Sequence, residues 1–209
     1  MSRRVALAHC SLLALGLLAG GPLGAAAAAR KILVLGDSLS AEYGLRRGSG
    51  WVELLSQRLQ RENRPWTVVN ASISGETTSG GRTRIADLLS RHRPGVVVIE
   101  LGGNDALRGL DLSLTERNLR ETVQAARSAG ARPLLLGMML PPNYGRTYAE
   151  RFAGVYRKVA ASEKSALVPF FLDGVAERLE LFQPDRIHPN EQAQPRMLEN
   201  VWPALVKLI

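Results

Sequence analysis

The chain has 209 residues, of which 45% are hydrophobic and 22% are charged, and its formal net charge is +8. This balance is typical of a globular protein with one domain and excludes a disordered or fibrous chain. Basic residues are scattered along the chain among acidic ones, so a solvated basic surface is the first interpretation, with weak attraction to anionic membranes or substrates as the alternative. No block of basic and aromatic residues indicates nucleic-acid binding.

Residues 1–29 have the layout of a secretory signal peptide. Arg3 and Arg4 precede an apolar stretch over residues 5–18, and Ala25–Ala29 offers small residues for cleavage. The stretch is shorter than the roughly 20 apolar residues that a membrane-spanning helix needs. We therefore expect a signal peptide over 1–29, one domain over 30–209 and a periplasmic or secreted location. Cleavage would remove Cys10, the only cysteine, together with two arginines, leaving a net charge of +6.

Short apolar runs alternate with amphipathic segments along the rest of the chain. The runs predict strands over residues 31–35, 66–70, 96–101, 133–139 and 166–168. Helices are predicted over residues 51–59, 84–90, 114–129, 148–165 and 191–209, the last with kinks at two prolines, Pro195 and Pro203. This alternation predicts an α/β fold in which helices cover both faces of a parallel sheet.

Distinctive polar residues follow the first three predicted strands, where an open parallel sheet gathers its functional groups. Ser38 comes directly after the first strand, so its hydroxyl can lie at the mouth of a cleft as a nucleophile. A serine that caps a helix or forms a turn is the alternative. Gly75 and Asn104 follow the second and third strands. With the Ser38 amide they offer three donors for an oxyanion, although each is also an ordinary turn residue.

A serine nucleophile needs a base, and only two histidines follow residue 29. His92 lies between two arginines at a predicted helix end, which indicates a solvated residue. His188 precedes the last helix, and Asp185 lies three residues before it. The carboxylate of Asp185 can therefore orient the imidazole of His188, with a helix-entry ion pair as the alternative.

Four blocks of the sequence carry a resemblance to a known family: Gly36-Asp37-Ser38-Leu39, Gly75, Gly102-x-Asn104-Asp105 and Asp185-x-x-His188. Their order and spacing resemble the SGNH, or GDSL, hydrolase family, in particular its bacterial periplasmic thioesterase, lysophospholipase and arylesterase branch. The resemblance implies a flavodoxin-like three-layer α/β/α sandwich with about five parallel strands. It also implies that Ser38, Asp185 and His188 are catalytic and that Ser38, Gly75 and Asn104 form the oxyanion hole.

The activity implied is that of a secreted serine esterase that hydrolyses acyl esters, thioesters or lysophospholipids through an acyl-serine intermediate. We expect a monomer without cofactor or metal, since two distant histidines do not make an ordinary zinc site. Substrate contacts are expected in the loops after the third and fourth strands, at Asp105, Leu107, Pro142 and Tyr144. A carbohydrate O-acetylesterase with a shallow polar groove is the alternative. A second alternative is a binding module without activity, but the intact set of catalytic residues argues against it.

Two positions depart from the resemblance, because Arg186 and Ala106 stand where glycine is common in this branch. Neither change removes a catalytic group. Arg186 follows Asp185 directly. Its cation either pairs in part with the Asp185 carboxylate, in competition with His188, or points into water.

Overall fold

The computed structural model describes residues 30–209, and the expected signal peptide over 1–29 lies outside the described residues. The described chain forms a parallel sheet of five strands in the order β2-β1-β3-β4-β5. The strands are β1 (Arg30–Gly36), β2 (Trp66–Asn70), β3 (Val96–Glu100), β4 (Arg132–Leu136) and β5 (Ala166–Val168). This is the flavodoxin-like strand order, so the predicted fold class is confirmed.

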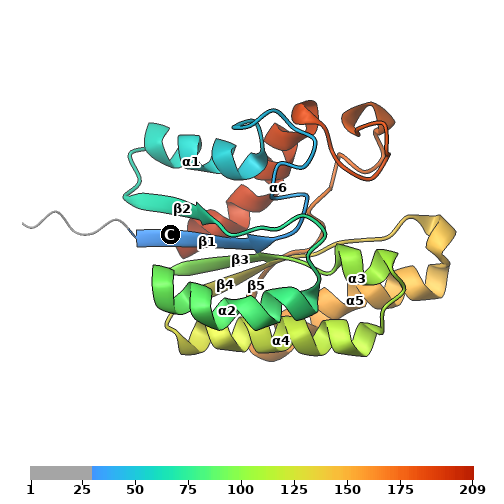
Figure 1. Cartoon of the computed structure of the whole chain (residues 1–209), viewed down its shortest axis with the longest axis horizontal. Coiled ribbons are helices and arrows are strands. Elements are labelled where there is room, and N and C mark those ends of the chain that lie inside the picture. Colours follow the sequence, from blue (N-terminus) through green and yellow to red (C-terminus); the bar gives the residue numbers. More distant parts are fainter. Residues whose placement is uncertain (1–29) are drawn as a thin grey trace, which may run out of the picture.

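Helices cover both faces of the sheet, with α1 and α6 on one face and α2, α4 and α5 on the other (Figure 1). Their bounds are α1 (Trp51–Arg61), α2 (Thr78–His92), α3 (Gly103–Leu107), α4 (Leu112–Ser128), α5 (Arg146–Glu163) and α6 (Gln194–Leu205). Short 3-10 turns are η1 (Pro142–Tyr144), η2 (Leu179–Leu181), η3 (Glu191–Ala193) and η4 (Val206–Leu208). Because both faces are covered, β3 is buried along its whole length, which explains the apolar run from Val96 to Ile99.

Helix α2 begins six residues before its predicted start. Thr77 caps it by accepting a hydrogen bond from the Gly80 amide on its side-chain oxygen. Glycine is a poor helix former, so the pair Gly80 and Gly81 indicated a loop. Packing explains Gly81, since a Cβ there would lie 2.3 Å from a Leu101 methyl group. Close approach of α2 to the sheet therefore requires glycine at this position.

The single helix predicted over residues 191–209 is a succession of η3, α6 and η4. Pro195 lies in the first turn of α6, where a proline costs no intrahelical hydrogen bond, so it starts the helix instead of kinking it. Pro203 lies inside α6 as expected. Within residues 30–209, no helix combines the length and apolar character needed to cross a bilayer.

Candidate active site

Three predicted residues meet at the carboxyl edge of the sheet, the right-hand side of Figure 1. The turn after β1 carries Ser38, and the segment between β5 and η3 carries Asp185 and His188. His188 Nε2 lies 2.9 Å from Ser38 Oγ, and His188 Nδ1 lies 2.6 Å from Asp185 Oδ2. His92 ends α2, before the chain enters β3 at the opposite edge. The fold therefore brings only one of these two histidines to Ser38.

The turn that presents Ser38 is held by its own backbone and by Asp37. The Asp37 carbonyl accepts hydrogen bonds from the amides of Ser40, at 3.2 Å, and Ala41, at 3.0 Å. Its carboxylate Oδ1 accepts the Leu39 amide at 3.0 Å. The Ser38 amide has no intramolecular acceptor within residues 30–209. The turn thus leaves both the hydroxyl and the N–H of Ser38 available.

Asp185 is held in its ionised form by three donors. Its carboxylate accepts the Ile187 amide at 2.9 Å, the His188 amide at 3.0 Å and the His188 ring. Partial desolvation raises the pKa of Asp185, but these hydrogen bonds outweigh it and lower the pKa to about 2. A carboxylate at Nδ1 places the ring proton there and leaves Nε2 free to accept the hydroxyl proton of Ser38.

Tyr43 is a site residue that the sequence analysis missed. Its ring packs on the His188 imidazole, with centroids 4.4 Å apart and planes at 40°. Gln183 fixes this loop by donating to the Tyr43 carbonyl at 2.8 Å and to the Pro189 carbonyl at 3.2 Å. No motif marks Tyr43, so an aromatic residue close after Ser38 was the only available signal.

The predicted oxyanion donors lie in the loops after β2 and β3. Gly75 has φ +78°, which favours glycine, and its amide has no acceptor in the described part of the chain. Asn104 Nδ2 donates to Asp37 Oδ2 and to the Glu76 carbonyl, both at 3.0 Å. Both hydrogens of the Asn104 amide are therefore engaged, and an acyl oxygen would have to share or displace one of these contacts.

The predicted substrate-contact residues divide into two groups. Leu107, at the end of α3, and Tyr144, in η1, are exposed, and Pro142 begins η1. The expectation that Asp105 contacts substrate is wrong, because its side chain points inward. It accepts hydrogen bonds from the amide and hydroxyl of Thr78, is only 3% exposed and so supports α2 instead of facing the cleft.

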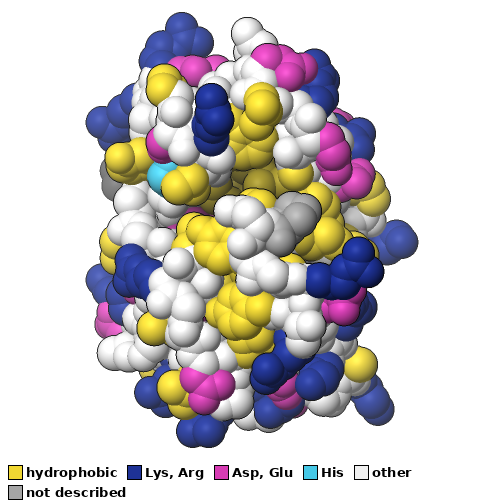
Figure 2. Space-filling model, turned by 90° about the vertical axis from the view of Figure 1, so that its right-hand side faces the viewer, with side chains coloured by type: hydrophobic (Ala, Val, Ile, Leu, Met, Phe, Trp, Pro, Cys, Tyr) yellow, Lys and Arg dark blue, Asp and Glu magenta, His cyan; other side chains and the backbone are white. Residues whose placement is uncertain are grey.

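Exposed large hydrophobic side chains gather around the catalytic set. Figure 2 shows this face, where an apolar band crosses the hollowed middle beside a histidine. All of these residues lie in loops, in short helices or in first helical turns that follow the carboxyl ends of strands: Tyr43, Ile73, Leu107, Leu110, Leu114, Met139, Tyr144, Leu179 and Ile187. Such a concentration on one face indicates contact with an apolar ligand.

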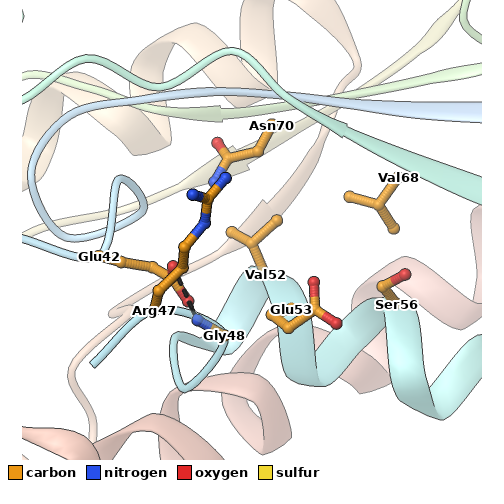
Figure 3. A pocket seen from close by; sticks show the side chains of 8 residues that line it. All are labelled: Glu42, Arg47, Gly48, Val52, Glu53, Ser56, Val68 and Asn70. Atoms are coloured by element: carbon orange, nitrogen blue, oxygen red, sulfur yellow. Dashed lines mark hydrogen bonds between the residues drawn. The ribbon is translucent and has the colours of Figure 1, made fainter. Parts of the chain in front are cut away.

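A separate hollow of about 290 Å³ lies between the turn after β1, α1 and β2 (Figure 3). Its lining is Glu42, Arg47, Gly48, Val52, Glu53, Ser56, Val68 and Asn70. Asn70 already bonds the Ser40 carbonyl and the Ser72 amide, and Glu42 bonds the Gly48 and Gly50 amides. The hollow contains no member of the catalytic set. Over residues 30–209, no group of three or more His, Cys, Asp or Glu side chains could hold a metal ion.

Arg186 forms no ion pair with Asp185 in residues 30–209. The residue is exposed and has φ +55°, while its amide donates to the Gln183 carbonyl at 2.9 Å. This left-handed conformation suits glycine and strains a residue with a Cβ. The departure at this position is therefore a matter of backbone conformation and not of charge at the triad.

Comparison with known proteins agrees with this geometry. Residues 34–195 match the GDSL-like Lipase/Acylhydrolase family. Esterase TesA of Pseudomonas aeruginosa is 55% identical over 183 residues, covering 88% of this chain and 91% of that protein. Thioesterase 1/protease 1/lysophospholipase L1 of Escherichia coli is 46% identical over 170 residues, covering 81% and 80%. A crystal structure of TesA superposes with a TM-score of 0.85 at 54% identity, covering 86% of this chain and 100% of that one. The chain therefore belongs to the GDSL-like lipase/acylhydrolase, or SGNH hydrolase, family and is an ester-hydrolysing serine hydrolase.

Proposed function

We propose that this enzyme hydrolyses acyl esters and thioesters, lysophospholipids among them, with Ser38 as its nucleophile. The observation that carries the proposal is the continuous relay from Ser38 Oγ through His188 to Asp185, at 2.9 and 2.6 Å. Nucleophile, base and orienting acid are each within hydrogen-bond reach of the next, as covalent catalysis requires. The names of the two relatives support the choice of esters and thioesters.

In the acylation step, His188 Nε2 takes the proton of Ser38 while Oγ attacks the acyl carbonyl carbon. The ionised Asp185 stabilises the imidazolium that forms. His188 then gives the proton to the departing alcohol or thiol, which leaves an acyl-Ser38 ester. Water attacks this ester with His188 again as base, and the carboxylic acid departs from Ser38.

The negative charge that develops on the acyl oxygen needs donors already in place. The amides of Ser38 and Gly75, which have no acceptor among residues 30–209, are two such donors. Asn104 is the third, and its contact with the Glu76 carbonyl is the one that an oxyanion would replace. The contact with Asp37 Oδ2 would remain and hold the amide in place.

The apolar face favours an acyl chain over an acetylated carbohydrate as the group next to the scissile bond. Leu107 and Tyr144 project from the two loops in which we expect substrate contacts, with Pro142 in the same turn as Tyr144. A carbohydrate O-acetylesterase would present a polar groove instead. The acyl chain is thus proposed to lie along the apolar band of Figure 2.

Export to the periplasm or beyond is part of the proposal and depends on the signal-peptide pattern of residues 1–29. N-terminal sequencing of the exported protein should begin within a few residues of Arg30. A mature protein that still carries Cys10 would contradict it. We propose a monomer with at most weak contact with membrane surfaces, to be checked by size-exclusion chromatography and vesicle sedimentation.

The test of the nucleophile is Ser38→Ala, assayed with p-nitrophenyl esters of increasing acyl length, an acyl thioester and a lysophospholipid. Turnover should fall to the residual acceleration of about 10³–10⁴ over water that oxyanion donors and binding alone provide. A fluorophosphonate should label Ser38 in the wild type and leave the variant unlabelled. Near-wild-type turnover by a folded Ser38→Ala protein would refute the covalent mechanism.

A further inference from the structure

Glu100 is a buried acid directly behind the nucleophile, and the mechanism above does not use it. It ends β3 opposite Gly36, and its side chain is 0% exposed. One carboxyl oxygen, Oε1, has no hydrogen-bond partner among residues 30–209. No lysine, arginine or histidine in this part of the chain forms an ion pair with Glu100. A buried carboxylate with an unpartnered oxygen and no counter-ion costs far more free energy than a buried neutral acid does.

The other oxygen of Glu100 ties down both ends of the turn that carries Ser38. Oε2 accepts the Asp37 amide at 3.2 Å and the Ser40 hydroxyl at 2.8 Å. Ser40 Oγ in turn accepts the indole N–H of the buried Trp51 at 3.1 Å. Glu100 therefore links the residue before Ser38 and the second residue after it to the core of the protein.

The backbone makes room for this link at Gly36. A Cβ on Gly36 would lie 2.8 Å from Ser40 Oγ and 2.9 Å from Glu100 Oε2, closer than real Cβ contacts allow. Glycine at the end of β1 thus lets the two side chains approach each other beneath the turn.

Burial raises the pKa of Glu100 well above its usual range, and the neighbouring charge of Asp37 raises it further. Burial also raises the pKa of Asp37, to about 6, whereas the Leu39 amide, the neighbouring Glu100 carboxyl group and the Asn104 amide favour its ionised form. The other ionisable groups that face this pair are Tyr156 from α5, which lies near both acids, and the His188 ring, which lies near Asp37. None of these is a permanent cation that would favour ionisation of Glu100.

We propose that Glu100 is a positioning residue that acts as a neutral carboxylic acid, fixing the turn around Ser38 and leaving Asp37 as the single charge that holds the Asn104 amide. The inference depends on the proposed function, because its effect on rate passes through Ser38 and Asn104. With the proton on Oε1, the carbonyl oxygen Oε2 accepts from both ends of the turn. A neutral Glu100 also keeps a second negative charge away from the developing oxyanion.

The first test is spectroscopic. The infrared difference spectrum of wild type minus Glu100→Gln at pH 7 should contain the carbonyl stretch of a protonated carboxyl group. Ser38→Ala minus Ser38→Ala/Glu100→Gln should contain the same band, because the protonation of Glu100 does not depend on catalysis. Absence of the band, with both proteins folded, would overturn the proposal.

The second test is kinetic and compares two neutral replacements. Glu100→Gln keeps a carbonyl acceptor, so kcat should stay within about threefold of wild type and any alkaline decline due to Glu100 ionisation should disappear. Glu100→Leu keeps the volume but loses the acceptor, so kcat should fall up to about 10²-fold, since small displacements of reacting groups cost that much, with KM little changed. If Glu100→Gln lost as much kcat as Glu100→Leu, a charged Glu100 would be required and the proposal would fail.

Ser40→Ala covers the case in which Glu100→Leu does not fold, since it removes one donor to Oε2 and leaves the carboxyl group in place. It should lower kcat by a smaller factor and leave the infrared band present. An unchanged kcat would refute the positioning role. Failure of the proposed function would be seen separately, as an active Ser38→Ala protein.

Discussion

Carboxyl groups lie on two sides of Ser38, and the structure shifts their pKa values in opposite directions. Asp185 lies near the surface, and donors from Ile187 and His188 lower its pKa to about 2 despite some desolvation. Asp37 lies beneath the turn, and burial raises its pKa to about 6, with Glu100 raised well above its usual value. A carboxyl group is thus ionised on one side of the nucleophile, at Asp185, and protonated on the other, at Glu100.

The contrast follows from the number of donors and from burial. Every oxygen of Asp185 has an N–H partner, so ionisation costs little there, and the charge is available to stabilise an imidazolium. Asp37 and Glu100 share a buried environment in which no lysine or arginine of residues 30–209 pairs with either acid, so one proton between them costs less than two charges. The catalytic charge, on Asp185, therefore lies where water and hydrogen-bond donors stabilise it. The buried pair, Asp37 and Glu100, holds the turn around Ser38 in place.

The largest effect on kcat is expected from neutralising Asp185, the carboxylate near the surface. Asp185→Asn should lower kcat by about 10³–10⁴-fold, because the side chain no longer selects the ring tautomer or stabilises imidazolium. Some stability should be lost as well above about pH 4, where the ionised carboxylate of Asp185 contributes fully, but the exposed site should still let the variant fold. Asp173→Asn is the matched control, an exposed acid paired with Arg196 away from the triad, and it should keep full activity. Equal kcat for both variants would contradict the assigned role of Asp185.

As pH rises, the free energy of unfolding that each site contributes changes in opposite directions at Asp37 and Asp185. The pKa of Asp37 is raised in the folded state, to about 6 against about 3.9 in an unfolded chain, so unfolding releases its proton between these values. Its contribution to the free energy of unfolding should therefore decrease as pH rises from about 4 to 6, by up to about 1.4 kcal/mol per pH unit for each proton. Asp185 has a lowered pKa, so its contribution is complete above about pH 4 and is lost as pH falls toward 2.

Urea unfolding of wild type, Asp37→Asn and Asp185→Asn from pH 3 to 7 measures both contributions. Asp37→Asn should flatten the profile between pH 4 and 6. Asp185→Asn should lower the whole profile above about pH 4 and change its slope only below that pH. If Asp37→Asn left the slope between pH 4 and 6 unchanged, Asp37 would not have the raised pKa assigned to it.

The sequence predicted the contacts among Ser38, His188 and Asp185, because Ser38 follows β1 directly, only two histidines follow residue 29, and the motif blocks resemble the family. It was insufficient where orientation depends on packing. Asp105 lies in a predicted substrate loop, but the five-residue helix α3 turns its carboxylate toward Thr78. The contacts of Glu100 could not be predicted from the sequence around it, where it follows an apolar run. Its partner Ser40 lies in the turn after β1, sixty residues earlier.

A smaller effect is expected at Tyr43, the aromatic partner of the His188 ring. Its face lies against an imidazole that becomes cationic during the reaction, and an exposed cation–π contact is worth about 0.5–1 kcal/mol. Tyr43→Ala should therefore lower kcat/KM by roughly three- to tenfold, including lost orientation of the ring. Tyr43→Phe keeps the aromatic face and should stay close to wild type. Equal losses in the two variants would assign the effect to the hydroxyl group.

The smallest effect is expected at Arg186, and it concerns stability instead of activity. With φ +55° and no ion pair to Asp185 in the described residues, its side chain brings strain without electrostatic gain. Arg186→Gly should raise the free energy of unfolding by about 0.5–1 kcal/mol, the relief of strain being partly offset by the greater freedom of glycine in the unfolded chain. Lys164→Gly is the matched control, because Lys164 has φ +48° at the end of α5, far from the triad in sequence. Both variants should be stabilised and should keep the wild-type pH–rate profile at low ionic strength. A profile that shifts with Arg186→Gly alone would show that this cation acts on the Asp185–His188 pair through solvent, since no direct contact carries it.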